Sequence, residues 1–401
     1  MGVYKSSGLI SNILGFLLII GYILPTSQAE FTMNPQMRYN CFFFLDAVAL
    51  FIILYEGKFD IRRLLFSFFT LFILLIFSEY ASVNYVGRLK TGVLLLYGTN
   101  IICCNITFSK IKATKFWDTL FMLMMSIILL FCFGTILNIE YLNHFLRIYY
   151  VDHLNYFLNN MLLQYKPVSF FVSHSIAAFN YVLFIVVLFI RDRYYKSQVI
   201  NKVFILGFIL SMLFLRSNSS IIFLLILFVM YITYMKKQGK KNSKFLIILL
   251  SVLLFTGLVI SNIDIIIMIL SSDRNGLIGR FSLDGALASS IKFITDINIP
   301  TGLYDIKYEG KWLLYIDSSY LINMMRGGVL LLVTYTYVVI RFIKKNIYNN
   351  RNLFILFILL FDFGYSFTWE QRFLSGFLFI LPYLKLLMEH NQVKTKSYNY
   401  I

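Results

Sequence analysis

The sequence is short of charge. Only 14% of its 401 residues are Asp, Glu, Lys or Arg, whereas a soluble domain carries roughly 25%. Hydrophobic residues make up 59% of the chain, and about 20 apolar residues cross a hydrocarbon core of roughly 30 Å. The composition therefore excludes a soluble globular chain and predicts about a dozen transmembrane helices. It also excludes an outer-membrane barrel, whose strands alternate apolar and polar residues.

The sequence also lacks the motifs of common enzyme classes. We find no Walker loop, Rossmann glycine pattern, HExxH or paired aspartates with metal spacing, and no GxSxG nucleophile elbow. The four cysteines show no metal spacing and no evident disulfide partner. These absences argue against nucleotide hydrolysis and a conventional metal site, so we expect neither a metal nor a cofactor. An enzyme of this kind needs a substrate that brings its own activated leaving group.

Apolar runs bounded by charge predict twelve membrane spans. The runs are 8–24, 42–54, 64–77, 91–108, 120–136, 168–190, 203–215, 221–234, 245–270, 320–340, 353–367 and 373–387. The predicted fold is therefore an all-α, polytopic integral membrane protein with one membrane domain over residues 1–401. Both termini are predicted to be cytoplasmic, with a polar cytoplasmic tail at 390–401.

The distribution of charge supports this topology, because Lys and Arg accumulate on cytoplasmic connections. The predicted cytoplasmic side holds 23 of the 36 basic and five of the 19 acidic residues, and the external side holds 13 and 14. The net charges are therefore +18 and −1. The basic residues are spread over seven cytoplasmic segments, so they indicate orientation in a lipid bilayer and argue against a nucleic-acid partner.

Two external connections are long. In 137–167, Tyr141, Phe145 and Ile148 recur at three and four residues, which predicts a helix lying at the membrane surface. The segment 271–319, between the ninth and tenth spans, holds most of the external charge. A connection much longer than is needed to join two spans suggests function.

Four arginines are predicted near the external face: Arg216, Arg280, Arg326 and Arg372. Guanidinium groups match phosphate oxygens in geometry and charge. Together the four could form a cationic cup for an anionic ligand presented from the outer leaflet. The alternative for each is an arginine that reaches toward lipid headgroups.

Two residues are candidate general bases. His174 is predicted at the outer end of the sixth span, and its reference pKa lies near neutrality. Asp317 closes the long external loop and could accept a proton or orient a sugar hydroxyl. The alternatives are a polar residue at an interfacial helix end for His174 and an N-cap of the tenth span for Asp317.

The order of motifs in residues 168–390 resembles a known family. The motifs are Arg216-Ser217-Asn218-Ser219-Ser220, Gly279-Arg280-Phe281-Ser282, Ile299-Pro300-Thr301-Gly302-Leu303, Asp317-Ser318-Ser319-Tyr320-Leu321 and Arg326-Gly327-Gly328. They are similar to those of bacterial O-antigen and capsule repeat-unit polymerases (Wzy-type), in a superfamily shared with O-antigen ligases. Two positions depart from the family: Arg216 precedes the serines, and Tyr304 replaces a second glycine.

The resemblance implies a metal-independent glycosyltransferase in the bacterial cytoplasmic (inner) membrane. It would join undecaprenyl-diphosphate-linked oligosaccharide repeat units on the outer face, in the biosynthesis of O-antigen, capsule or exopolysaccharide. The cup arginines would hold the diphosphate, with Arg280 stabilising its developing charge, and His174 or Asp317 would deprotonate the attacking sugar hydroxyl. A flippase and a chain-length regulator of the same pathway are the implied partners.

Other functions remain open at this point. An O-antigen ligase uses the same donor with a different acceptor. A lipid-linked oligosaccharide flippase or other transporter normally shows two related halves and midplane charges, whereas here the unusual charge lies in one external loop. A structural membrane scaffold is disfavoured by that same charged loop.

The sequence generates a first prediction at Arg280. Replacing Arg280 with alanine should abolish polymer and leave lipid-linked single repeats, because the leaving diphosphate loses its stabilising cation. Gel analysis of lipid-linked products from cells measures this, and normal chain lengths in the variant would contradict it.

Overall fold

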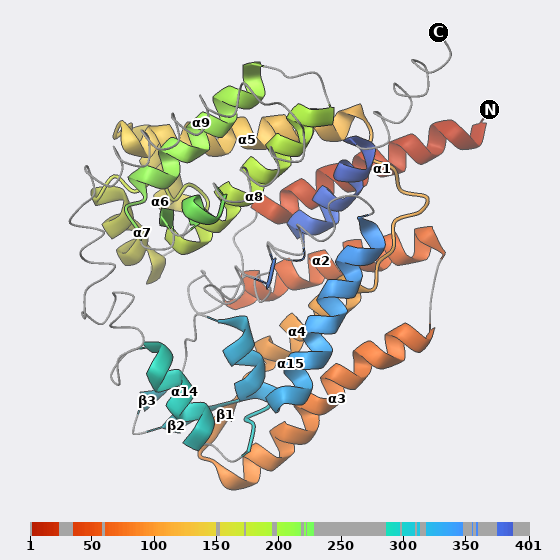
Figure 1. Cartoon of the computed structure of the whole chain (residues 1–401), viewed down its shortest axis with the longest axis vertical. Helices are drawn as coiled ribbons and strands as arrows, with labels where there is room; N and C mark the ends of the chain where they lie inside the picture. The colour runs from red at the N-terminus through yellow and green to blue at the C-terminus, as the bar shows by residue number, and fades with distance from the viewer. Residues whose placement is uncertain are drawn as a thin grey trace, which may run out of the picture.

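A computed structural model of the chain is mostly helical (Figure 1). It describes residues 2–23, 35–57, 61–149, 153–171, 174–194, 199–217, 220–221, 223–227, 286–296, 299–308, 311–312, 318–347, 355, 358–359 and 375–387. Its elements are α1 Gly2–Ile23, α2 Pro35–Glu56, α3 Ile61–Asn84, β1 Gly87–Leu89, α4 Thr91–Cys104, α5 Lys115–Ile136, α6 Glu140–Tyr149, α7 His153–Leu163, α8 His174–Tyr194, α9 Val199–Phe214, α14 Ala286–Asp296, β2 Tyr304–Tyr308, β3 Lys311–Trp312 and α15 Ser319–Asn346.

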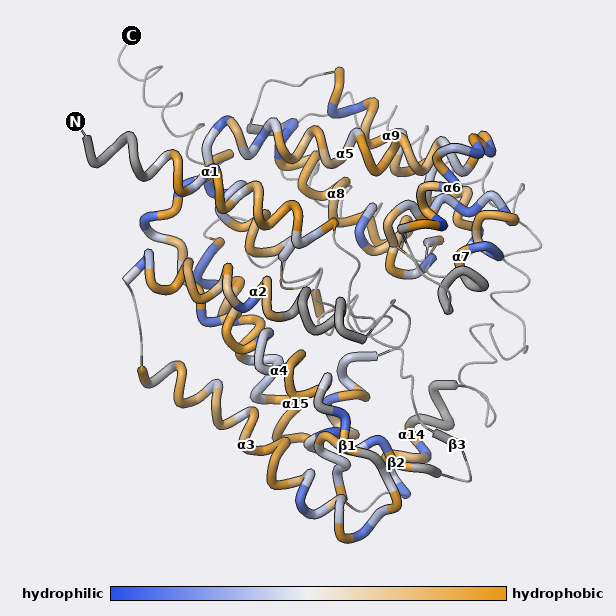
Figure 2. The backbone as a smooth tube through the Cα atoms, turned by 180° about the vertical axis from the view of Figure 1, so that it is seen from behind, coloured by the Kyte–Doolittle hydropathy of each residue, from blue (hydrophilic) through white to orange (hydrophobic). Residues whose placement is uncertain are grey.

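Among the described residues, four helices are long and apolar enough to cross a membrane. They are Leu64–Asn84 in α3, Lys115–Ile136, His174–Asp192 in α8 and Ser319–Asn346. Shorter apolar helices are Gly8–Ile23, Gly92–Cys104, Val199–Phe214 and Ser375–Leu387. Figure 2 shows apolar residues along the helix bodies and hydrophilic residues gathered at their ends. The predicted helical membrane protein is therefore confirmed in this coarse form, and the count of twelve spans stays a prediction, since 245–270 lies outside the described residues.

The helices form two neighbouring groups (Figure 1). In one, α5 packs against α9 and α1, and α8 packs against α9; in the other, α15 packs against α3 and α4. The contacts of α2 with α1 and with α4 join the groups. Helix α8 is the most deeply buried of the four long helices, because 83% of its most apolar 18-residue stretch is buried. Most buried apolar side chains of both groups belong to one continuous core, whereas Met325 of α15 packs with Phe293 and Ile306 in a second, smaller cluster.

The long connection 137–167 contains the predicted helix. Helix α6 exposes Tyr141 (90%), Phe145 (50%) and Ile148 (63%) on one face and buries Leu146 on the other. Its inner face packs on α5 so closely that a Cβ on Gly134 would collide with Leu142. An exposed apolar face of this kind suits the membrane interface, and that location stays a prediction.

Some predicted boundaries were wrong. The helix of the sixth predicted span begins at His174 and not at residue 168, because residues before it form turns. Tyr165, with φ 55°, ends α7 in a Schellman arrangement in which Lys166 N donates to Met161 O and Tyr165 N donates to Leu162 O. The fourth span ends at Cys104, before residue 108. The three-stranded sheet β1-β2-β3 was not predicted, so the fold is not purely helical.

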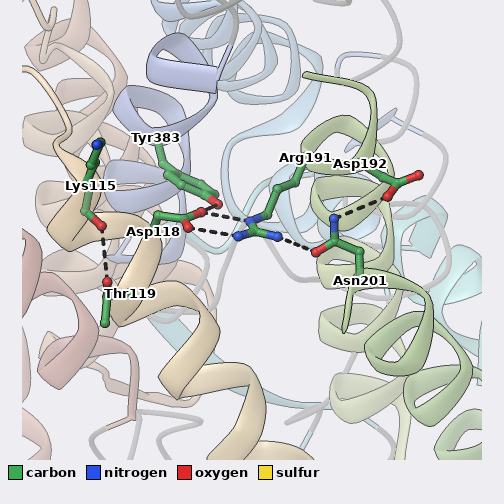
Figure 3. A network of polar contacts seen from close by, with 7 residues as sticks. All are labelled: Lys115, Asp118, Thr119, Arg191, Asp192, Asn201 and Tyr383. Carbon is green, nitrogen blue, oxygen red and sulfur yellow. Dashed lines mark hydrogen bonds and ion pairs between the residues drawn. The ribbon is translucent and has the colours of Figure 1, made fainter. Parts of the chain in front are cut away.

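A polar network joins α5, α8, α9 and the helix Ser375–Leu387 (Figure 3). Asp118 of α5 accepts hydrogen bonds from Arg191 Nε and Nη2, both at 2.8 Å, and from Tyr383 OH at 2.5 Å. Arg191, only 4% exposed, also donates to Asn201 of α9. A buried ion pair adds little net stability over apolar side chains, but it fixes how its elements meet.

We predict that Arg191→Met strongly destabilises the protein. Removing one partner leaves the Asp118 carboxylate without its main cation, which costs about 3–5 kcal/mol. The matched control is Arg147→Met, which breaks the largely exposed pair with Glu140 and a hydrogen bond to Asn159 and should cost only about 1 kcal/mol. Thermal unfolding in detergent compares the two variants, and equal midpoints would contradict the assigned role of the network.

Candidate functional site

The carboxylate of Asp305 binds two cations from distant parts of the chain. Its Oδ1 accepts a hydrogen bond from Arg326 Nη2 at 2.6 Å, and its Oδ2 lies 2.7 Å from Lys90 Nζ. Asp305 is 3% exposed and Arg326 7% exposed. We call Asp305, Arg326 and Lys90 the loop clamp, because they attach the segment 299–308 to α15 and to the connection between α3 and α4.

The loop clamp stands beside a break in α15. Gly327 and Gly328 leave helical geometry, and Gly328 has φ 64°, which glycine adopts without strain. Such a break removes helical N–H donors from the carbonyls that precede it. Here the loop supplies them: Thr301 N donates to Met325 O and Gly302 N donates to Arg326 O, both at 2.9 Å.

The same loop is held from α3 and β1. Leu303 N donates to Ser78 Oγ at 2.8 Å, and Lys90 N donates to Leu303 O at 2.9 Å. Strand β1 pairs antiparallel with β2, with Arg88 opposite Asp305. Gly302 has φ 57°, and a Cβ there would collide with the backbone of Ser78. The motif around Pro300 is therefore packed tightly between α3 and α15.

Arg326, which the sequence predicted to bind phosphate, is bonded to groups of its own chain. Besides Asp305, its Nη1 donates to Tyr304 O at 2.6 Å and to Gly302 O at 3.3 Å. The guanidinium is thus buried among acceptors of its own chain. This assigns Arg326 to positioning the loop, since a phosphate would have to displace a carboxylate and two carbonyls.

Arg216, by contrast, is exposed. It follows α9 with φ 46°, and its N–H donates to Leu213 O, so it occupies the left-handed position that usually ends a helix with glycine. This conformation costs a residue with a Cβ about 1–2 kcal/mol. Among the described residues, Arg216 has no carboxylate partner. A strained residue with an exposed charge is a candidate for function.

Lys166 is a further cation that the sequence did not single out. Its residue is half-buried, and burial together with the charge of Arg216 lowers the pKa of Lys166 below its usual value. In the described part of the chain it too lacks an acidic partner. We call Lys166 and Arg216 the cationic pair. No motif singles out Lys166 in the sequence.

The remaining predicted residues are placed as follows. His174 is the first residue of α8 and is half-buried. Arg280, Asp317 and Arg372 lie outside the residues that the structure describes. The two described members of the predicted cup, Arg216 and Arg326, have separate surroundings, one beside Lys166 and the other in the loop clamp.

Comparisons with protein families, curated proteins and solved structures gave no match to this chain. The class that the fold itself defines is a mostly helical membrane-associated protein.

A substitution at Gly302 tests whether the loop around Pro300 packs tightly against α3. Gly302→Ala should destabilise the protein by about 2 kcal/mol or more, because alanine is strained at this φ and collides with Ser78. The matched control is Gly98→Ala in α4, where the added Cβ meets nothing within 4 Å and helix propensity favours alanine. Thermal unfolding in detergent measures both, and an unchanged midpoint for Gly302→Ala would contradict the seating.

Proposed function

We propose that the chain is a polysaccharide polymerase. It joins undecaprenyl-diphosphate-linked oligosaccharide repeat units on the outer face of the bacterial cytoplasmic membrane, as a metal-independent glycosyltransferase. A flippase that delivers the repeat units and a regulator of chain length are its proposed partners.

One observation carries the proposal. The motif Pro300-Thr301-Gly302 and the motif Arg326-Gly327-Gly328 resemble the polymerase family separately, and in the fold they form one hydrogen-bonded unit. The contact is specific, because the first motif supplies the N–H groups that the broken helix of the second one lacks. Short motifs that match by chance have no reason to complete each other's hydrogen bonds.

The grouping of the helix ends also supports the proposal. Segments predicted outside meet at the β1-β2 pairing and at Ser78 with Leu303. Segments predicted inside meet elsewhere: Glu56 accepts from Ser109 N at 2.9 Å and Ile111 N at 2.8 Å. A chain that alternates across a membrane requires such separate groups.

The proposed chemistry is an attack by a sugar hydroxyl on the carbon that bears the lipid diphosphate. His174 or Asp317 takes the hydroxyl proton, the glycosidic bond forms, and the bond to the diphosphate oxygen breaks. The lipid diphosphate leaves with the electron pair, and Arg280, Arg216 and Arg372 stabilise its charge. Arg326 holds the loop in place and does not contact the phosphate.

Arg216→Gly separates function from stability. Glycine suits the left-handed position, so the variant should fold at least as well as the parent, gaining up to about 1 kcal/mol. It should nevertheless lose most polymer formation, because a phosphate ligand is gone. Thermal unfolding and polymerisation of a lipid-linked repeat unit by the purified protein measure the two effects.

The matched control is Asn138→Gly. Asn138 ends α5 in the same left-handed conformation, with φ 55°, but carries no charge, so polymer formation should persist. Full activity of Arg216→Gly would contradict the role of the arginine. Transfer of single repeats to another acceptor would instead identify a ligase, and transport without any transfer would identify a flippase.

A further inference from the structure

Helix α5 carries a stripe of exposed apolar side chains that ends where α6 begins. The stripe consists of Phe116, Leu123, Leu130 and Leu137, which are between 41% and 69% exposed. Its members recur every seven residues, which is close to two helical turns of about 3.6 residues each, so they lie on one side of the helix. Since α5 is long and apolar enough to cross a membrane, this side suits contact with acyl chains.

The exposed hydroxyl groups on the same side of α5 are bonded within the helix. Ser126 Oγ donates to Met122 O at 2.9 Å, and Thr119 Oγ1 donates to Lys115 O at 3.3 Å. A hydroxyl group that faces hydrocarbon needs such a partner, because lipid offers none. The side of α5 that carries the stripe therefore does not need water to satisfy these two side chains.

Helix α6 is attached to the end of α5 by its buried side. Thr135 Oγ1 of α5 donates to Asn143 Oδ1 at 3.2 Å, and Asn143 Nδ2 donates to Asn138 Oδ1 at 3.2 Å. The backbone adds a bond from Ile139 N to Gly134 O at 2.7 Å. These contacts fix the rotation of α6 about its own axis, and so fix which of its sides lies next to the stripe.

The exposed apolar residues of α6 form a face that continues the stripe. Tyr141, Phe145 and Ile148 lie within about 60° of one another around the helix, because each residue turns it by about 100°. Phe145 packs on Phe131 of α5, with ring centroids 5.4 Å apart, and Tyr141 follows Leu137, the last member of the stripe, by four residues. We call Tyr141, Phe145 and Ile148 the insertion face.

The charges of α6 lie away from the insertion face and neutralise each other. Arg147 Nη1 lies 2.7 Å from Glu140 Oε1, and Arg147 Nε donates to Asn159 Oδ1 of α7 at 3.1 Å. Both charged residues lie roughly 110–130° around the helix from the middle of the insertion face. With His144 neutral, α6 has no net charge to attract anionic headgroups, so the burial of apolar area has to supply its attraction to a membrane.

We propose that the insertion face is a lipid-binding surface that enters the acyl region of the leaflet in which α5 ends, whatever the charge of the headgroups. Its continuity with the stripe of α5 favours acyl chains over water or a second protein as the occupant. Because α6 is bonded to α5, the insertion face sets how deeply this end of the helix bundle lies in the leaflet. The proposal does not depend on the proposed function.

Nitroxide labels on single cysteines of the full-length protein in phosphatidylcholine nanodiscs test this. The labelling parent carries Cys41→Ser, and the cysteines that the structure describes are buried. Labels at Phe145→Cys and Ile148→Cys should be relaxed by oxygen more than by a water-soluble nickel complex, as expected about 5–10 Å below the headgroups. Leu130→Cys, in the stripe, should give the same pattern.

The matched control is His144→Cys, one residue from Phe145 and on the charged side of α6. Its label should be relaxed several-fold more by the nickel complex than the label at Phe145. Equal access of the nickel complex to both positions would show that water covers the insertion face, and would overturn the proposal. Protection of Phe145 from both reagents, with spin–spin broadening between copies, would identify a second copy of the chain as the occupant and overturn it too.

A second lipid composition tests the role of charge. In nanodiscs of equal parts phosphatidylcholine and phosphatidylglycerol, the labels at Phe145 and Ile148 should report the same depth as in phosphatidylcholine alone. Insertion only in the anionic mixture would contradict the proposal, because the paired charges of Glu140 and Arg147 would then not explain how α6 binds. The depth measurement is made without substrate, so its outcome is separate from that of a polymerisation assay.

Discussion

The carboxylate of Asp305 fixes how the segment 299–308 lies against α15 and against the connection between α3 and α4. It binds Arg326 at 2.6 Å and Lys90 at 2.7 Å, and so connects the broken helix α15, the loop before it and the connection between α3 and α4. A buried ion pair of this kind contributes little net stability compared with apolar packing. Its effect is to select one position for a loop that must supply the hydrogen bonds missing at Gly327 and Gly328.

Polar contacts also fix the positions of helices at the ends that are predicted to be cytoplasmic. Asp118, Arg191 and Tyr383 fix three helices against one another (Figure 3), and Glu56 accepts backbone N–H groups of the chain that follows α4. Between these ends the helices meet mainly through apolar side chains, with a few buried hydrogen bonds such as those of Tyr97 OH to Asn323 Oδ1 and of Asn100 Nδ2 to Tyr335 OH. The polar contacts therefore set the register of the bundle, while the cationic pair is left with charge that its described surroundings do not neutralise.

The sequence predicted most described helices, because apolar runs of about 20 residues have few alternatives in a membrane. It did not predict the break in α15 as a binding surface for Thr301 and Gly302, since a pair of glycines does not reveal which segment completes the hydrogen bonds. The ion pair of Arg326 was not predicted for a related reason: its acceptor, Asp305, comes close only when the loop folds back. The lowered pKa of Lys166 was not predicted either, because it depends on burial and on the charge of Arg216, 50 residues later in the chain.

The most direct measurement is product analysis with the purified protein and one undecaprenyl-diphosphate-linked repeat unit. The account predicts a series of lipid-linked products that differ by one repeat-unit mass in mass spectrometry, with undecaprenyl diphosphate released at each step and no loss of activity in a chelator. Unchanged substrate under conditions where the protein is folded and binds the donor would contradict it.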